Sequence, residues 1–154
     1  MRIAFDTNVL AYAEGIDGEH LRQAAWNVIA RIRSETLVVP AQVLGELFNV
    51  LEREAKYPRQ AARKAILDWV DLFVVIDTAS EILLNAVDLA VEHKFQIWDA
   101  VILSAASNAD CQILLSEDMQ DGFTWGGVTI VNPFLERPNA LLAALLDPPA
   151  GPST

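Results

Sequence analysis

The sequence has a single cysteine, Cys111, among its 154 residues. One thiol cannot form an intrachain disulfide and cannot build a zinc site from several cysteines. The residues before Asp6 include one arginine and an apolar run too short for the core of a signal peptide. No stretch comes near the roughly 20 apolar residues that span a bilayer. These absences predict a cytoplasmic protein that has no membrane partner.

Basic residues are also scarce, with 11 lysines and arginines against 21 acidic residues and a net charge of −10. This balance argues against a protein that binds nucleic acid through its overall charge. One short segment nevertheless contains five of the basic residues: Arg53, Lys56, Arg59, Arg63 and Lys64. The segment predicts a local cationic surface for RNA contacts or, alternatively, an ordinary solvated helix face.

Hydrophobic residues make up 53% of the chain, which is enough for one domain with a full core. Residues 1–134 are expected to form this domain, and residues 135–154 a proline-rich tail that is partly disordered. Within the tail, residues 141–146 have the pattern of a short helix, and residues 150–154 are expected to be disordered. The four tryptophans are interpreted as core or interface anchors rather than platforms for base stacking, and Trp125, beside two glycines in the acidic loop, is the strongest exception to consider.

The apolar pattern predicts strands that alternate with helices. Strands are expected at residues 2–5, 37–39, 73–76, 113–115 and 128–131. Helices are expected from about residue 9, where Thr7 or Asn8 would form the cap, and over residues 21–32, 41–56, 58–72, 80–93 and 98–106. This alternation predicts an α/β domain with a largely parallel sheet.

Two acidic residues fall where predicted strands end. Asp6 follows the first strand directly, and Asp118 comes shortly after the strand at 113–115. Ligands of open α/β sheets bind outside the carboxyl ends of the strands. Asp118 also has Glu117 and Asp121 as acidic neighbours, a cluster that a solvated turn would explain equally well.

Two further acids lie on predicted helices. Glu46 stands in an apolar helix, where a carboxylate is costly unless it binds a cation or contacts a neighbour such as Asn49 or Arg53. Asp99 begins an apolar helix, a position that also suits a helix cap. Taken together with Asp6 and Asp118, these residues indicate an oxygen-ligand site for a hard cation, Mg²⁺ or Mn²⁺.

The segments around these four acids resemble, in order, the acidic positions of the PIN-domain nuclease family. They are Phe5-Asp6-Thr7-Asn8-Val9-Leu10, Val43-Leu44-Gly45-Glu46-Leu47, Ile97-Trp98-Asp99-Ala100-Val101-Ile102 and Leu114-Leu115-Ser116-Glu117-Asp118. Each motif alone is common, but the ordered set is much more specific and covers the chain from Met1 to about Phe134. The resemblance implies a three-layer fold, a central mostly parallel sheet flanked by helices, and metal-dependent hydrolysis of phosphodiesters, usually in RNA.

The resemblance also implies roles and partners. Asp6, Glu46, Asp99 and Asp118 would hold one or two Mg²⁺ or Mn²⁺ ions. The residues expected around them are Asn8, Ser116, Glu117 and Asp121, although local capping also explains Asn8 and Ser116. Many small bacterial members are toxins of toxin–antitoxin pairs of the VapC type, so the expected partners are single-stranded or structured RNA, an antitoxin protein and a second copy of the chain. The helix pair at residues 43–72 offers an apolar surface for such a homodimer.

Two other functions fit the same residues. A small phosphatase or other Mg²⁺-dependent phosphotransfer enzyme would use Asp6 as nucleophile, but that chemistry usually has a second acid two residues later, where this chain has Asn8. A binding module without catalysis would use the carboxylates only to attract a nucleic-acid or protein partner. It predicts no metal binding and therefore no thermal stabilisation by Mn²⁺.

Overall fold

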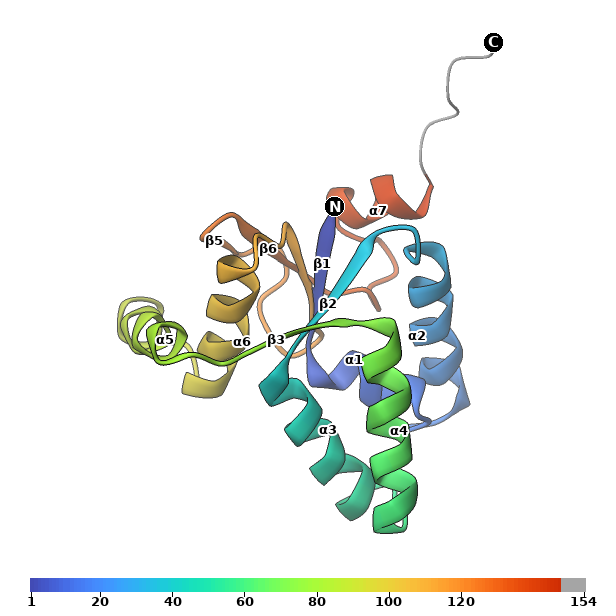
Figure 1. Ribbon diagram of the computed structural model, residues 1–154. Coiled ribbons are helices and arrows are strands. Elements are labelled where there is room, and N and C mark those ends of the chain that lie inside the picture. Colours follow the sequence, from blue (N-terminus) through green and yellow to red (C-terminus); the bar gives the residue numbers. More distant parts are fainter. Residues whose placement is uncertain (148–154) are drawn as a thin grey trace.

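A computed structural model describes residues 1–147, which contain one six-stranded sheet (Figure 1). The strands run in the order β3-β2-β1-β4-β6-β5, and all neighbours are parallel except β5 and β6. Their bounds are β1 (Arg2–Phe5), β2 (Thr36–Pro40), β3 (Val74–Ile76), β4 (Ile113–Leu115), β5 (Thr124–Trp125) and β6 (Val128–Val131). The predicted α/β class with a mostly parallel sheet is confirmed.

Helices cover both faces of the sheet. Within the described part of the chain they are α1 (Thr7–Ala13), α2 (Glu19–Arg31), α3 (Ala41–Arg53), α4 (Arg59–Leu72), α5 (Ser80–His93), α6 (Ile97–Asn108) and α7 (Ala140–Leu146). The pair α5 and α6 lies to one side of the sheet, and α1, α2 and α4 lie to the other, which gives the three layers (Figure 1). No helix of residues 1–147 is long and apolar enough to cross a membrane.

The central strands are apolar on both faces because helices bury them from both sides. Ile3, Ala4 and Phe5 of β1 are fully buried, as is every residue of β4. The ring of Phe5 meets that of Phe73 edge-on at 5.0 Å, which fixes the entry to β3 against the centre of the sheet.

The neighbouring strands β1 and β4 end side by side. Phe5 pairs with Leu115, and the backbone N–H of Asp6 donates to the Leu115 carbonyl at 2.9 Å. The chain continues from β1 to β2 on one side, whereas β6 and β5 extend the sheet on the other side of β4. In such sheets the point where the strand order reverses is the usual position of a ligand site. The α3–α4 pair projects beyond this edge (Figure 1).

The structure corrects the predicted start of the first helix. Helix α1 begins at Thr7, two residues before the expected position, and Asp6 rather than Thr7 or Asn8 forms its cap. Asp6 has an extended backbone, and its side chain accepts a hydrogen bond from the Thr7 N–H at 2.7 Å. Asp6 therefore follows β1 directly, with its backbone still paired to β4, and caps α1 with its side chain.

Among the other elements, α3 and β5 differ most from the sequence expectation. Helix α3 ends at Arg53 rather than at residue 56, because Lys56 has a left-handed backbone with φ 55° that no helix can continue. Strand β5 was not predicted, since two residues give no alternating pattern. It pairs with β6 across Gly126 and Gly127, which both have positive φ.

The carboxyl-terminal segment includes a helix at the predicted place. Leu142 of α7 is fully buried, and Arg31 of α2 donates to the Leu146 carbonyl and to Asp147, both at 2.7 Å. These hydrogen bonds therefore hold the end of α7 against α2. The expected disorder of residues 150–154 lies outside the described residues.

Candidate active site

Asp6 is the most buried acid at the carboxyl end of the sheet, with 4% of its surface exposed. Its Oδ1 accepts from the Thr7 N–H at 2.7 Å, and its Oδ2 accepts from the Ser116 hydroxyl at 2.7 Å and from the Asn8 amide at 3.3 Å. Ser116 is itself fully buried just after β4. These donors fix the orientation of the carboxylate.

Asn8 joins the two strand ends. Its Nδ2 donates to Asp6 and, at 3.0 Å, to Asp118, while its Oδ1 accepts from the Glu117 N–H at 3.2 Å. Because one amide bridges both carboxylates, Asp118 is held beside Asp6 although 112 positions of sequence separate them. Asn8 and Ser116 thus contact Asp6 and Asp118, two of the four acids around which the sequence analysis expects them.

Glu46 reaches the same edge from α3. Its Oε2 accepts from the Thr7 hydroxyl at 2.6 Å and its Oε1 from the Gln42 amide at 2.8 Å. The alternative partners proposed from the sequence, Asn49 and Arg53, make no hydrogen bond or ion pair with it. Thr7 and Gln42 were missed as site residues, although Gln42 stands one helical turn before Glu46.

Asp99 lies in the first turn of α6, but its carboxylate does not form the cap. Gln96 does so, accepting the Asp99 N–H at 3.0 Å. The Asp99 carboxylate has no hydrogen bond to any described residue, and it shares a hollow of about 220 Å³ with Asp118. Gln96 therefore performs the capping that the sequence analysis considers for Asp99. The Asp99 side chain instead lines this hollow.

The carboxylates repel one another, and this repulsion contributes to the raised pKa values of two of them. Burial is the largest effect on Asp6 and raises its pKa to about 6, with Asp99 and Glu46 adding to the rise and hydrogen bonds from Ser116 and Thr7 opposing it. The pKa of Asp99 is also raised, first by burial and then by Asp118 and Glu46. A cation among them would relieve this repulsion.

The donor set fits a hard divalent cation, because all its atoms are carboxylate, amide or hydroxyl oxygens. Within residues 1–147 no three acidic, histidine or cysteine side chains lie close enough together to form a ready-made metal site. Hydrogen bonds instead hold Asp6 and Glu46 to their own neighbours. A cation held by three of these acids would therefore require their side chains to move.

Tyr12 borders the acids from α1 and was not foreseen. Burial, followed by Glu117 and then Asp17, raises the pKa of the Tyr12 phenol to about 12, so the phenol stays protonated at neutral pH. Its ring meets that of Phe134 edge-on at 5.3 Å. Together with Glu46 and Asp118 it lines a hollow of about 460 Å³. Its position one helical turn after Asn8 is the feature of the sequence that places it on the same side of α1.

Glu117 and Asp121 differ in their placement. One carboxylate oxygen of Glu117 is buried without a hydrogen-bond partner among the described residues, beside Tyr12. Asp121 instead accepts from the Asn132 N–H at 2.8 Å and lines none of the hollows around the acids. Glu117 is thus linked to the acids through its backbone bond to Asn8, whereas Asp121 has no such link.

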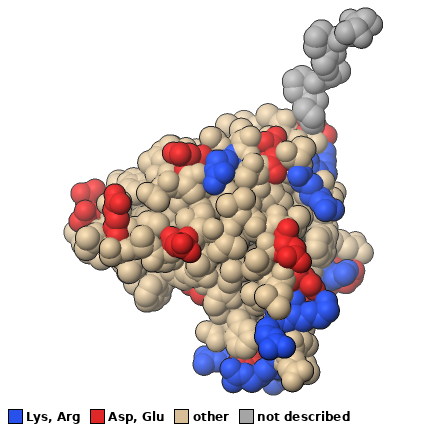
Figure 2. All heavy atoms as spheres, in the orientation of Figure 1, with Lys and Arg blue, Asp and Glu red and all other residues tan. Residues whose placement is uncertain are grey.

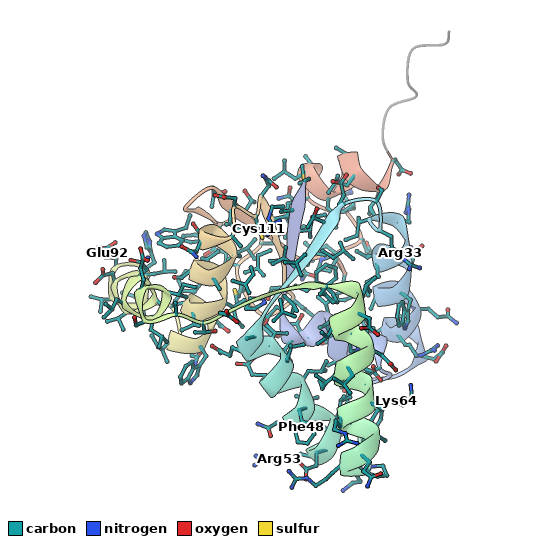
Figure 3. All side chains as sticks on the ribbon, in the orientation of Figure 1. Arg33, Phe48, Arg53, Lys64, Glu92 and Cys111 are labelled. Carbon is teal, nitrogen blue, oxygen red and sulfur yellow. The ribbon has the colours of Figure 1, made fainter. Side chains whose placement is uncertain are left out.

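The basic residues of the α3–α4 pair gather at its far end, below the sheet (Figure 2). In Figure 3 Arg53 lies near the tip of the pair, and Lys64 lies further along α4. Arg59 contacts Glu52 at 3.4 Å and lies over the Phe48 ring, and Lys64 contacts Asp68 at 2.8 Å. Arg53, Lys56 and Arg63 are exposed and have no ion pair within residues 1–147.

Solved structures with the same fold include a toxin and toxin–antitoxin complexes. Mycobacterium tuberculosis VapC20, a sarcin–ricin loop cleaving toxin, is 20% identical with a TM-score of 0.61, over 73% of this chain and 86% of that one. A toxin–antitoxin complex from Klebsiella pneumoniae is 22% identical with a TM-score of 0.62, over 86% and 98%. DNA-bound VapBC from Salmonella typhimurium is 15% identical with a TM-score of 0.61, over 84% and 96%.

A comparison with curated proteins gives no significant match. The family model described as PIN domain, in contrast, matches residues 3–120, a span that includes all four acids. PIN domains are typically nucleases and generally bind divalent metals. Because the match covers most of its length, the chain belongs to the PIN domain family.

Proposed function

We propose that this protein is an endoribonuclease that depends on Mg²⁺ or Mn²⁺. The proposal is supported by four acids from separate segments that are linked near the carboxyl end of β1 and β4. Asn8 bonds to both Asp6 and Asp118, Thr7 bonds to both Asp6 and Glu46, and Asp99 lines a hollow with Asp118. Asp6 and Asp99 have raised pKa values there. Such an arrangement is costly for the fold by itself, and its oxygen atoms suit a hard cation.

Asp6, Glu46 and Asp99 would hold one or two ions, with Asp118 binding directly or through water. The metal, when bound, lowers the pKa of a water molecule and neutralises charge on the scissile phosphate. The protein's own contribution is orientation. Thr7 and Gln42 fix Glu46, and the amide and hydroxyl donors described above fix Asp6 and Asp118.

Cleavage of a mixed-sequence single-stranded RNA by the wild-type protein tests this proposal. We expect fragments in Mg²⁺ or Mn²⁺ and none in EDTA. Attack by water predicts 5′-phosphate and 3′-hydroxyl ends. Fragments that form in EDTA, or that carry 2′,3′-cyclic phosphate, would contradict the mechanism, and turnover of a generic phosphomonoester without RNA cleavage would favour a phosphatase.

Removing the Ser116 hydroxyl should weaken metal binding. Ser116→Ala takes the short 2.7 Å donor from Asp6 Oδ2, so the carboxylate would lose part of its orientation and its pKa would rise further. We expect metal affinity or activity to fall about 10- to 100-fold, as is usual when a residue that orients a ligand is lost. Ser34→Ala, at an exposed loop residue, is the matched control, and equal Mn²⁺ affinity of the two variants would contradict this role.

The exposed basic residues of the α3–α4 pair are proposed to contact the RNA backbone. Charge reversal of Arg53 and Arg63 should weaken RNA binding and reduce its salt dependence, by about 0.7 in log–log slope for each lost phosphate contact. Arg33→Glu is the control, because Arg33 is also exposed but lies between α2 and β2, away from the tip of the α3–α4 pair (Figure 3). An unchanged salt slope in the Arg53 and Arg63 variants would leave this face as an ordinary solvated surface.

An antitoxin and a second copy of the chain are proposed as protein partners. Two of the similar structures are toxin–antitoxin complexes, and the 460 Å³ hollow beside the acids is lined by Asp17, Glu46, Glu54 and Asp118, which suits a basic peptide. Co-expression with the product of a small adjacent reading frame should yield a complex that no longer cleaves RNA. The mass of the purified chain in solution tests the homodimer.

A further inference from the structure

Trp98 is an exposed aromatic residue next to the acids. It precedes Asp99 in α6, and 51% of its surface is exposed. Trp26 is also partly exposed, but it stacks on Trp69 at 5.2 Å and donates to the Ala13 carbonyl at 2.8 Å. Trp98 has no aromatic partner and no hydrogen bond among residues 1–147, so the packing of this fold does not account for it.

The Trp98 ring forms one wall of a hollow of about 440 Å³. The opposite side is α3, which contributes Gln42, Gly45, Glu46 and Asn49. The lining is mostly apolar, with two side-chain amides. Glu46 belongs to both this hollow and the group of acids, so an occupant of the hollow would lie directly beside a phosphate held at the carboxylates.

Gly45 keeps this hollow open. It lies inside α3, where glycine destabilises a helix relative to alanine. Its backbone does not have a positive φ, and a Cβ added there would meet nothing within 4 Å. Neither backbone conformation nor packing therefore requires glycine at this position. What its lack of a side chain provides is open space facing the Trp98 ring.

We propose that this hollow binds a nucleobase next to the scissile phosphate and that the Trp98 indole stacks on it. An aromatic ring can stack on any of the bases, so the Trp98 side of the hollow needs no hydrogen-bond donor of its own. The amide of Asn49 and the free Oε1 of Gln42 lie within the lining to meet the base edge. This inference rests on the proposed ribonuclease function and adds a base subsite to it.

The test has a binding arm and a cleavage arm. The binding arm measures the fluorescence anisotropy of a labelled single-stranded RNA in Ca²⁺, which replaces Mn²⁺ to suppress cleavage. We expect Trp98→Ala to weaken binding about 5- to 100-fold and Trp98→Phe to retain most of it. Gly45→Leu should fill the hollow and weaken binding while its Tm stays at or above that of the wild type. Val91→Ala, which removes an exposed apolar side chain from α5, is the matched control.

The cleavage arm uses RNAs that carry one abasic ribose at successive positions around a mapped cut. One position should slow the wild type as much as Trp98→Ala does, and the two changes combined should add little to either alone. Full binding and cleavage by Trp98→Ala, or independent effects of the two changes, would overturn the subsite. A change of molecular mass in Trp98→Ala with unchanged RNA affinity would instead assign the face to contact between copies.

The two arms also separate this inference from the proposed function. If the wild type binds RNA but does not cleave it in Mn²⁺, the nuclease proposal fails, and the anisotropy of the variants still decides whether a base binds at Trp98. If the wild type binds no RNA, both are contradicted.

Discussion

Asp99→Asn should reduce RNA cleavage to below about one hundredth of the wild-type rate. Loss of a residue that only orients a metal ligand already costs about 10- to 100-fold, and a direct ligand should cost more. The fold should tolerate the change, because Gln96 caps α6 and the Asp99 carboxylate has no hydrogen bond within the described chain. Initial rates at saturating Mn²⁺, together with the Tm of each protein, measure this.

Asp121→Asn is the control for that experiment. Asp121 lies in the same acidic loop as Asp118, but it bonds only to the Asn132 N–H and does not reach the other acids. The same loss of one negative charge should leave its cleavage rate within about twofold of the wild type, because exposed charges at a distance are screened. Equal loss of activity in both variants would indicate a general charge effect and contradict a localised site.

Asp6→Asn should abolish cleavage as well, yet stabilise the metal-free protein above pH 6. The pKa of Asp6 is raised from 3.8 to about 6 in the folded chain, mainly by burial. Well below pH 3.8 the carboxyl is protonated in both folded and unfolded chains. Above pH 6 it is ionised in both, and keeping the charge buried costs the folded state about 3 kcal/mol. The wild type should therefore lose stability as pH rises from about 4 to 6.

Asparagine removes the charge but accepts fewer hydrogen bonds than the carboxylate does. We therefore expect a net gain of about 1–2 kcal/mol at pH 8 in EDTA, and no gain at pH 4. Urea unfolding of both proteins at the two pH values measures the difference. A variant less stable than the wild type at pH 8 would show that the hydrogen bonds to Asp6 outweigh its burial.

Most of the fold followed from sequence pattern because its strands are short apolar runs between helices with clear periodicity. The start of α1 was misplaced for a physical reason. The backbone of Asp6 still pairs with β4 while its side chain caps α1. A sequence pattern assigns each residue to one element only. Strand β5 depends on pairing with β6 across a glycine turn, which local propensity does not reveal.

The acids of the candidate site were predictable, since strand ends and an isolated Glu46 in an apolar helix are visible in the sequence. Their partners were not. Thr7 reaches Glu46 only because α3 packs against α1, and Tyr12 meets Glu117 only because β4 lies beside β1. Trp98 is interpreted from the sequence as a core or interface anchor, and its half-exposed side chain excludes the core. Such contacts arise from the packing of distant segments.

The most direct test of the metal-dependent site is a calorimetric titration of the purified protein with Mn²⁺ at pH 7.5. We predict one or two ions bound per chain, binding lost in Asp99→Asn and retained in Asp121→Asn, and weaker binding at pH 5.5, where Asp6 is mostly protonated. No Mn²⁺ binding by the wild type, or binding that Asp99→Asn leaves unchanged, would contradict the proposal that these carboxylates form the centre of a nuclease.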